Sequence, residues 1–133
     1  MNIERIEGIG PANAEKLSKA GIKTVGAMLK KGATPKGRKE IAEKSGLSKE
    51  KILDFVNMAD LFRIKGVGTQ YSELLEAAGV DTVKELAQRN ADNLHKAMVE
   101  TNQAKKLVRV VPAKSQVSDW VAQAKKLPRV VEY

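Results

Sequence analysis

Apolar and polar residues alternate along most of the chain with the period of an α-helix. Near the end, Val117, Trp120, Val121 and Ala124 fall on one helical face, so Trp120 is expected in the core. Helix starts are marked by Thr, Ser, Asp or Pro, and helix ends by Gly. These signals predict eight helices: from Pro11 to before Gly21, from Thr24 to Gly32, from Thr34 to Gly46, from Ser48 to about Phe62, from Thr69 to Gly79, and from Thr82, Asp92 and Ser115.

Two stretches depart from this helical pattern. Residues 105–116 include a run of β-branched residues that ends at Pro112, which predicts a loop or a short strand. The tail, residues 128–133, is expected to be extended. The pattern as a whole predicts an all-α fold, with Thr82 and Glu85 forming a capping box.

The apolar pattern occurs twice. A shift of 58 positions places residues 6–27 on residues 64–85, and the copies share mainly glycines and apolar residues. A fainter match at a shift of 65 pairs Asp54-Phe55-Val56 with Asp119-Trp120-Val121, so the second copy has gained seven residues, near 105–116. We therefore divide the chain into residues 1–61 and 62–133, each predicted to hold about four helices.

Each copy contains a Gly-x-Gly turn, Gly8-Ile9-Gly10 or Gly66-Val67-Gly68. Glycine adopts positive φ and has no Cβ, so such a turn is tight and presents backbone N–H groups outward. A helix follows each turn, and the positive end of its dipole favours an anion such as a phosphate oxygen. The middle residue of each turn is predicted to point inward as an anchor.

The sequence Ile6-Glu7-Gly8-Ile9-Gly10-Pro11, followed by Leu17, Gly21-Ile22 and Thr24-Val25, resembles the helix-hairpin-helix motif of DNA repair proteins, polymerases and ligases. The resemblance covers residues 3–29 and 52–87. The full layout is similar to an uncharacterised family of tandem helix-hairpin-helix proteins built on a domain of unknown function. The resemblance implies that the hairpins at Gly8, Ile9, Gly10 and at Gly66, Val67, Gly68 bind DNA phosphates from the minor-groove side. It also implies a monovalent cation on hairpin carbonyls, although no cofactor is required.

The two turns differ in their surroundings. Only seven residues precede Gly8, so the leading helix of the first motif is expected to be missing or a single turn, and Glu7 places a negative charge beside it. The second turn follows a long predicted helix and has Arg63 and Lys65 beside it, although the helix that follows carries acids and no base. We expect the second turn to be the main phosphate site.

Charge favours a polyanionic partner. The 133 residues carry 24 Lys and Arg against 16 Asp and Glu, a net charge of +8. Lys30, Lys31, Lys36, Arg38 and Lys39 lie together without an acid among them, and we take Lys36, Arg38 and Lys39 as candidate DNA contacts. The alternative is that these bases only keep the surface solvated. With two Phe, two Tyr and one Trp, the chain lacks a stacking platform for single strands, so duplex DNA is favoured.

The sequence offers no candidate catalytic or metal chemistry. There is no cysteine, and His95 is the only histidine, so neither a histidine-based metal site nor a catalytic triad can be assembled. No lysine is marked as a Schiff-base nucleophile, so we expect no enzyme. The charged N-terminal residues contain neither a secretory signal nor a membrane anchor, which makes a cytoplasmic location the expectation.

Two questions of interpretation stay open. Residues 37–56 are similar to a helix-turn-helix, with Ala42 and Gly46 at the expected spacing, but an ordinary corner between two helices is favoured. The predicted function is sequence-independent binding of double-stranded DNA by a non-enzymatic accessory or architectural factor. The alternative is a protein–protein scaffold that recruits a DNA repair or replication enzyme.

Overall fold

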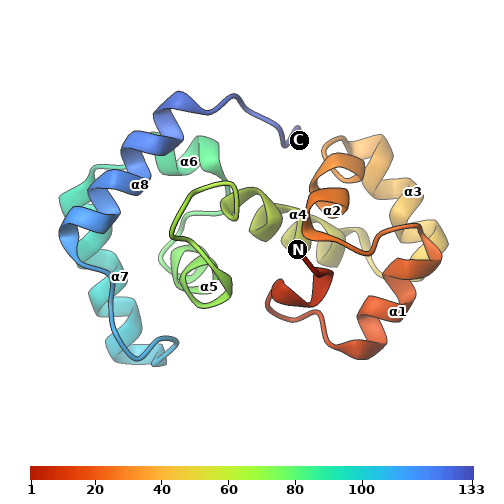
Figure 1. Ribbon diagram of the computed structural model, residues 1–133, viewed down its shortest axis with the longest axis horizontal. Helices are drawn as coiled ribbons and strands as arrows, with labels where there is room; N and C mark the ends of the chain where they lie inside the picture. The colour runs from red at the N-terminus through yellow and green to blue at the C-terminus, as the bar shows by residue number, and fades with distance from the viewer. The chain divides into compact units, whose positions relative to one another are not determined.

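The computed structural model describes residues 1–133, and every regular element in it is helical. There are eight α-helices, α1 to α8, and one short 3-10 helix, η1, whose order along the chain can be followed in Figure 1. No strand forms, and a single isolated bridge pairs Asn2 with Thr24. The predicted all-α fold class is confirmed.

The chain divides into two compact units, each described here by itself. Unit 1 comprises Met1–Asp60 and Val130–Tyr133, and unit 2 comprises Leu61–Arg129. The sequence alone places residues 130–133 with the second segment, whereas in the structure these residues belong to unit 1. Unit 2 is thus inserted, in sequence, between two parts of unit 1.

Unit 1 is made of short helices around an aliphatic interior. Its elements are η1 (Ile3–Arg5), α1 (Pro11–Lys19), α2 (Val25–Lys31), α3 (Pro35–Ser45) and α4 (Lys49–Leu61), the last of which reaches the boundary with unit 2. Helix α1 packs on α3, and η1 contacts both α1 and α2. The most deeply buried large side chains of this unit are Ile6, Leu17, Ile22, Met28 and Ile52.

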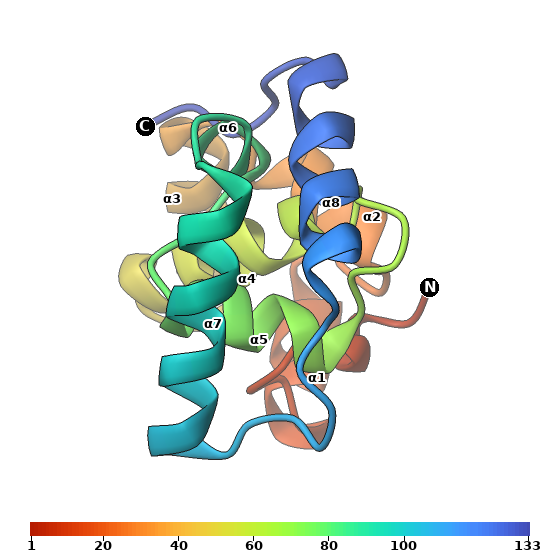
Figure 2. The same ribbon diagram turned by 90° about the vertical axis from the view of Figure 1, so that its left-hand side faces the viewer.

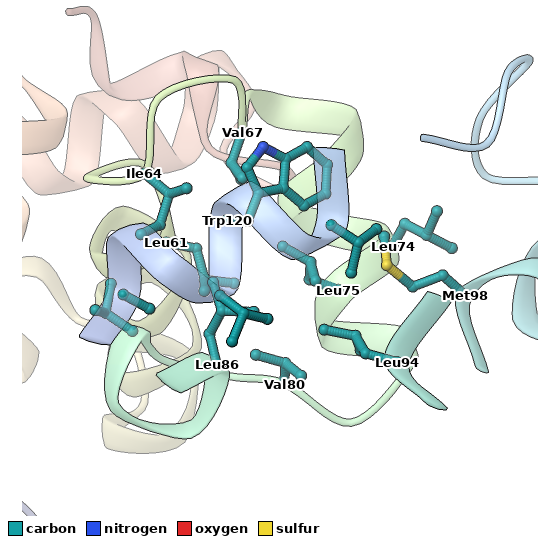
Figure 3. Packing of buried hydrophobic residues seen from close by; sticks show 14 of the residues in the cluster. Leu61, Ile64, Val67, Leu74, Leu75, Val80, Leu86, Leu94, Met98 and Trp120 are labelled. Atoms are coloured by element: carbon teal, nitrogen blue, oxygen red, sulfur yellow. The ribbon is translucent and has the colours of Figure 1, made fainter. Parts of the chain in front are cut away.

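Unit 2 is organised around its last helix. Its elements are α5 (Thr69–Ala77), α6 (Val83–Ala87), α7 (Ala91–Lys105) and α8 (Lys114–Lys126). Helix α8 packs on α6 and α7, and Figure 2 shows α7 and α8 side by side. Trp120 of α8 is 1% exposed and shares one apolar cluster with Val67, Leu75 and Leu86 (Figure 3). Its predicted place in the core is confirmed.

Threonine caps set several helix starts as the sequence predicts. The hydroxyls of Thr24, Thr34 and Thr82 each accept a hydrogen bond from the backbone N–H three residues on. The capping box predicted at Thr82 is only half formed, because the Glu85 carboxylate accepts from the N–H of Asp81, at 3.1 Å, one residue before the cap.

Two predicted helix starts are each late by one residue. Helix α7 begins before Asp92 because the side chain of Asn90 serves as the cap. Helix α8 begins before Ser115, where the side-chain oxygen of Gln116 accepts from the N–H of Ala113 at 3.0 Å. At α7 the side chain of Asn90 therefore has the capping role that the sequence pattern assigned to Asp92, whereas the N-cap of α8, Ala113, makes no side-chain hydrogen bond.

Side chains also hold the two non-helical stretches in place. The connection from α7 to α8 is a loop without a strand, and Asn102 binds both the N–H and the C=O of Val108, at 2.9 and 3.0 Å. In the tail, Val131 is 3% exposed and the N–H of Glu132 donates to the carbonyl of Ala33 at 2.7 Å. The tail is therefore part of the packing of unit 1.

Candidate functional site

The two Gly-x-Gly turns have the same backbone conformation. In turn 1 (residues 8–10) and turn 2 (residues 66–68), the first glycine is left-handed, with φ of 89° at Gly8 and 97° at Gly66. The second glycine is extended, with φ of −85° at Gly10 and −111° at Gly68, and directly precedes a helix. Each turn thus bends sharply and leads into a helix. Helix α1 begins with Pro11, which has no backbone N–H, whereas α5 begins with Thr69.

The middle residue of each turn is an apolar anchor, as predicted. Ile9 is 3% exposed and Val67 is 6% exposed. Each donates its backbone N–H to the carbonyl three residues earlier, of Ile6 or Ile64, at 3.1 Å. Burial of these side chains leaves the glycines on either side nearer the surface.

The first glycine of each turn is required by the fold. Besides its positive φ, each packs against an aromatic side chain: a Cβ on Gly8 would lie 3.6 Å from Phe55, and a Cβ on Gly66 would lie 3.0 Å from Nε1 of Trp120. A side chain at Gly66 would therefore strain the backbone and press on the indole ring. Phe55 and Trp120 are the aromatic residues paired by the fainter sequence match.

The second glycine of each turn is not required by the fold. Any residue adopts the extended conformation of Gly10 and Gly68, and a Cβ at either position would have no atom within 4 Å. The missing side chain nevertheless keeps the space before the helix open. A ligand can thus approach the backbone closely at these positions.

Backbone N–H groups at the two turns are also available to a ligand. Helices α1, α5 and α8 have N-caps without a side-chain hydrogen bond, and only in α1 and α5 is that cap glycine. Helices α2, α3, α6 and α7 are capped by Thr or Asn. In turn 2, the N–H groups of Gly66 and Gly68 have no hydrogen-bond acceptor within the chain. Helix N-terminal amides in this state are suited to bind an anion.

A side chain of helix α8 supports the residue directly before turn 2. The side chain of Gln123 accepts from the N–H of Lys65 at 2.9 Å and donates to the carbonyl of Lys65 at 3.2 Å. The same amide donates to Asp119 at 2.8 Å, which orients it. Sequence reasoning missed Gln123, because nothing in a pattern of local spacing connects residues 58 positions apart.

The charges beside the two turns differ, and so do the helices before them. Glu7 is exposed next to turn 1, whereas Lys65 is exposed next to turn 2. Arg63 is half-buried and donates to the carbonyl of Pro128 at 2.7 Å, so its charge is partly committed. Before turn 1 stands only the single turn η1, as predicted, whereas the 13-residue α4 precedes turn 2.

The prediction that Arg38 is an exposed DNA contact, like its basic neighbours, is wrong. It is 7% exposed, and its guanidinium donates to the carbonyls of Gly32 at 2.8 Å and Glu132 at 2.6 Å. Burial lowers the pKa of Arg38, while attraction to Tyr133 and Glu132 acts in the opposite direction. Arg38 thus fastens the tail and is not available to a ligand, whereas its neighbours Lys36 and Lys39 are exposed on α3.

The arrangement provides little for a metal ion. No group of three or more His, Cys, Asp or Glu side chains converges. His95 lies 3.1 Å from the carbonyl of Pro112 and supports the α7–α8 connection. At turn 2, the carbonyls of Ile64 and Lys65 each accept a hydrogen bond. The monovalent cation that the resemblance implies stays a prediction. No helix has the length and apolarity needed to cross a membrane.

Comparison with known proteins gives a family and no function. A family model described as a domain of unknown function (DUF4332) matches residues 7–127. Neither the curated proteins nor the solved structures contain a match. Because the family match spans most of the 133 residues, the chain belongs to the DUF4332 family.

Proposed function

We propose that this chain binds double-stranded DNA without sequence preference, through the backbone amides of its Gly-x-Gly turns, and that it acts as a non-enzymatic accessory or architectural factor. The observation that carries the proposal is the second glycine of each turn. Gly10 and Gly68 are extended and have open space at Cβ, so packing does not explain them. Glycine suits the N-cap position of both residues, and close approach of a ligand to the backbone gives a further reason for glycine there.

A phosphate oxygen is the ligand chemistry that these turns suit. The N–H of Gly68 belongs to the N-cap of α5, where the helix dipole adds positive potential, and Gly66 lies two residues earlier in the turn. Amides recognise a phosphate without reading a base, which is why we expect no sequence preference. The small number of aromatic residues favours the duplex over single strands.

Unit 2 is the better candidate for the main contact. It contains 12 basic and 7 acidic residues, against 12 and 9 in unit 1. Lys65 is exposed beside turn 2, and Gln123 fixes the backbone of Lys65 directly before the turn. Glu7 makes turn 1 less favourable to phosphate, so we assign turn 1 a weaker role.

We further propose that the two units are degenerate helix-hairpin-helix repeats. Two observations support this: the matched φ angles of the turns, and the matched contacts of Phe55 with Gly8 and of Trp120 with Gly66. In this interpretation η1 is what remains of the leading helix of the first motif. The motif's occurrence in DNA repair proteins, polymerases and ligases is then consistent with a DNA-binding role.

The sharpest test compares two glycine-to-alanine variants in a titration with a fluorescent duplex. Gly68→Ala places a methyl group before the open amides without a clash, and Gly26→Ala adds the same group to exposed α2, also without a clash. We expect Gly68→Ala to weaken binding by about tenfold, the worth of one charge-assisted hydrogen bond, and Gly26→Ala to leave it unchanged.

Salt dependence provides the second part of this test. If the amides and lysines neutralise phosphates, the logarithm of the affinity falls with the logarithm of the salt concentration by about 0.9 per phosphate contacted. No binding at low salt would end the proposal. Equal affinities for Gly68→Ala and the native chain would assign the binding to lysines rather than to turn 2.

A scaffold that recruits a repair or replication enzyme remains the second candidate function. The observation that favours it is the charge at turn 1, where exposed Glu7 would repel a phosphate. If turn 1 does not bind DNA, the surface of unit 1 is free for another partner. A pull-down that recovers no protein after nuclease treatment would count against this candidate.

A further inference from the structure

Unit 1 contains a groove whose lining includes Lys36 and Lys39, two of the lysines that the sequence offers as candidate DNA contacts. It has a volume of about 510 Å³ and lies between the first turns of α3 and α4, the yellow-orange to olive helices of Figure 1. Its surface is mostly apolar, and Pro35 and Leu53 contribute to its lining. We call it the α3–α4 groove. Its volume is within the range of pockets that bind small ligands or a few side chains.

Three lysines contribute to the same lining. These are Lys36, Lys39 and Lys49, and all three are exposed. The ammonium group of each makes no hydrogen bond or ion pair within the chain. Glu50 is the one acid in the lining. Arg38 also borders the groove, but its guanidinium is bound to two backbone carbonyls on the inside of the unit. The groove therefore combines three available positive charges and one negative charge with a mostly apolar surface.

We propose that the α3–α4 groove binds an acidic peptide segment of another protein, with an apolar side chain of that segment seated against Leu53 and its carboxylates facing the three lysines. Charge complementarity defines the acidic partner. The apolar lining argues for a peptide over a nucleic acid, because a phosphate backbone has no side chain that gains from covering Leu53 and Pro35. Protein–protein contacts commonly combine apolar surface with polar and charged residues, as this groove does.

The two parts of the groove make separable contributions. The lysines are exposed, so they should mainly raise the association rate and make binding salt-dependent. The apolar surface should decide which acidic peptides bind tightly. A peptide with carboxylates alone should therefore bind more weakly than one with carboxylates around an apolar residue.

The test uses the full chain and a fluorescein-labelled peptide of aspartate and glutamate with one central leucine. A second peptide has serine in place of that leucine. Binding is measured by fluorescence anisotropy for the native chain and for Lys36→Glu/Lys39→Glu, in which both substitutions are exposed near the start of α3, where negative charge suits the helix dipole. The matched control is Lys16→Glu/Lys19→Glu, which makes the same change in net charge on exposed positions of α1.

We expect the leucine peptide to bind the native chain at least about tenfold more tightly than the serine peptide. Lys36→Glu/Lys39→Glu should weaken it by about tenfold or more, while Lys16→Glu/Lys19→Glu should change it less than about threefold. Equal binding of the two peptides, or equal loss in the two variants, would overturn the proposal in favour of nonspecific charge attraction. Loss of duplex DNA binding in Lys36→Glu/Lys39→Glu with no peptide binding would overturn it in favour of nucleic acid.

Discussion

At the scale of single residues, the two glycines of a turn have different physical reasons to be glycine. Gly66 has φ of 97° and lies under Trp120, so the fold itself excludes a side chain there. Gly68 is extended and faces open space. A sequence shows only two glycines, and only their φ angles and surroundings separate the structural glycine from the candidate functional one.

The first prediction follows from this difference. Gly66→Ala should lower the free energy of unfolding by about 1–3 kcal/mol, because alanine is strained at positive φ and its Cβ would press on Trp120. Gly68→Ala should change it by less than about 1 kcal/mol, since a less flexible unfolded chain offsets a poorer N-cap. Urea denaturation measures both. Equal losses would show that Gly68 is also structural.

Arg38 carries the second prediction. Arg38→Met should lower the free energy of unfolding by about 2 kcal/mol or more, because the carbonyls of Gly32 and Glu132 lose a charged donor. Lys39→Met, which removes the same charge from the next residue, should stay within about 0.5 kcal/mol, because Lys39 is exposed. Similar values for the two variants would contradict the role of Arg38 in fastening the tail.

The same residue marks a limit of prediction from sequence. Arg38 and Lys39 are adjacent bases in one run, and their spacing cannot separate them. The difference comes from Glu132, which is 94 positions away and reaches Arg38 only after the tail has packed on unit 1. By contrast, the anchoring roles of Ile9 and Val67 were predictable, because each follows from a turn of three residues.

At the scale of elements, side-chain amides hold the non-helical segments. Gln123 binds both backbone groups of Lys65, and Asn102 does the same for Val108. Each amide thus substitutes for the backbone partner that an irregular segment lacks. The conformation of turn 2 therefore depends on the hydrogen bonds of Gln123 in α8 as well as on its own glycines.

A third prediction tests this support of turn 2. Gln123→Leu should lower the free energy of unfolding by about 1–2 kcal/mol, the net worth of two partly exposed hydrogen bonds, and should speed exchange of the Lys65 amide proton. Gln103→Leu, at an exposed position of α7, is the control and should do neither. Hydrogen exchange followed by NMR distinguishes the two. An unchanged Lys65 amide in Gln123→Leu would contradict the assigned support.

The end of α7 carries a fourth prediction. Lys106 is the only non-glycine residue at positive φ, 53°, and its N–H donates to the carbonyl of Asn102 at 2.8 Å. Lys106→Gly should therefore raise the free energy of unfolding by about 0.5–1 kcal/mol. Lys105→Gly, one residue earlier and still helical, should lower it by up to about 1 kcal/mol. A thermal melt in which both variants lose stability would contradict this explanation.

Most helix starts and ends could be predicted from the sequence, because they depend on capping residues close by in the chain. The starts after Thr24 and Thr34 and the end at Gly46 each depend on neighbours within one helical turn. The start of α7 was misplaced for a similar local reason: Asn90 and Asp92 are both good caps, and the sequence does not say which one the chain uses. The Gln123 and Arg38 contacts are long-range, and no local pattern contains them.

At the scale of the whole molecule, the two units do not simply follow one another along the chain, because the tail belongs to unit 1. Val130–Tyr133 is part of unit 1, although Leu61–Arg129 forms unit 2. Val131 is buried, and Arg38 and Ala33 bind the tail backbone at Glu132. Two candidate binding features, turn 2 in unit 2 and the α3–α4 groove in unit 1, are thus carried by one chain and can be disabled separately.

NMR titration of the isotope-labelled chain with a short DNA duplex shows directly whether amides of the turns contact phosphate. Amide protons that begin to hydrogen-bond phosphate move downfield, so we predict that the largest downfield changes occur at Gly66 and Gly68, with smaller ones at Gly8 and Gly10 because of Glu7. Unmoved Gly66 and Gly68 signals, with changes confined to residues around Lys36 and Lys39, would contradict it.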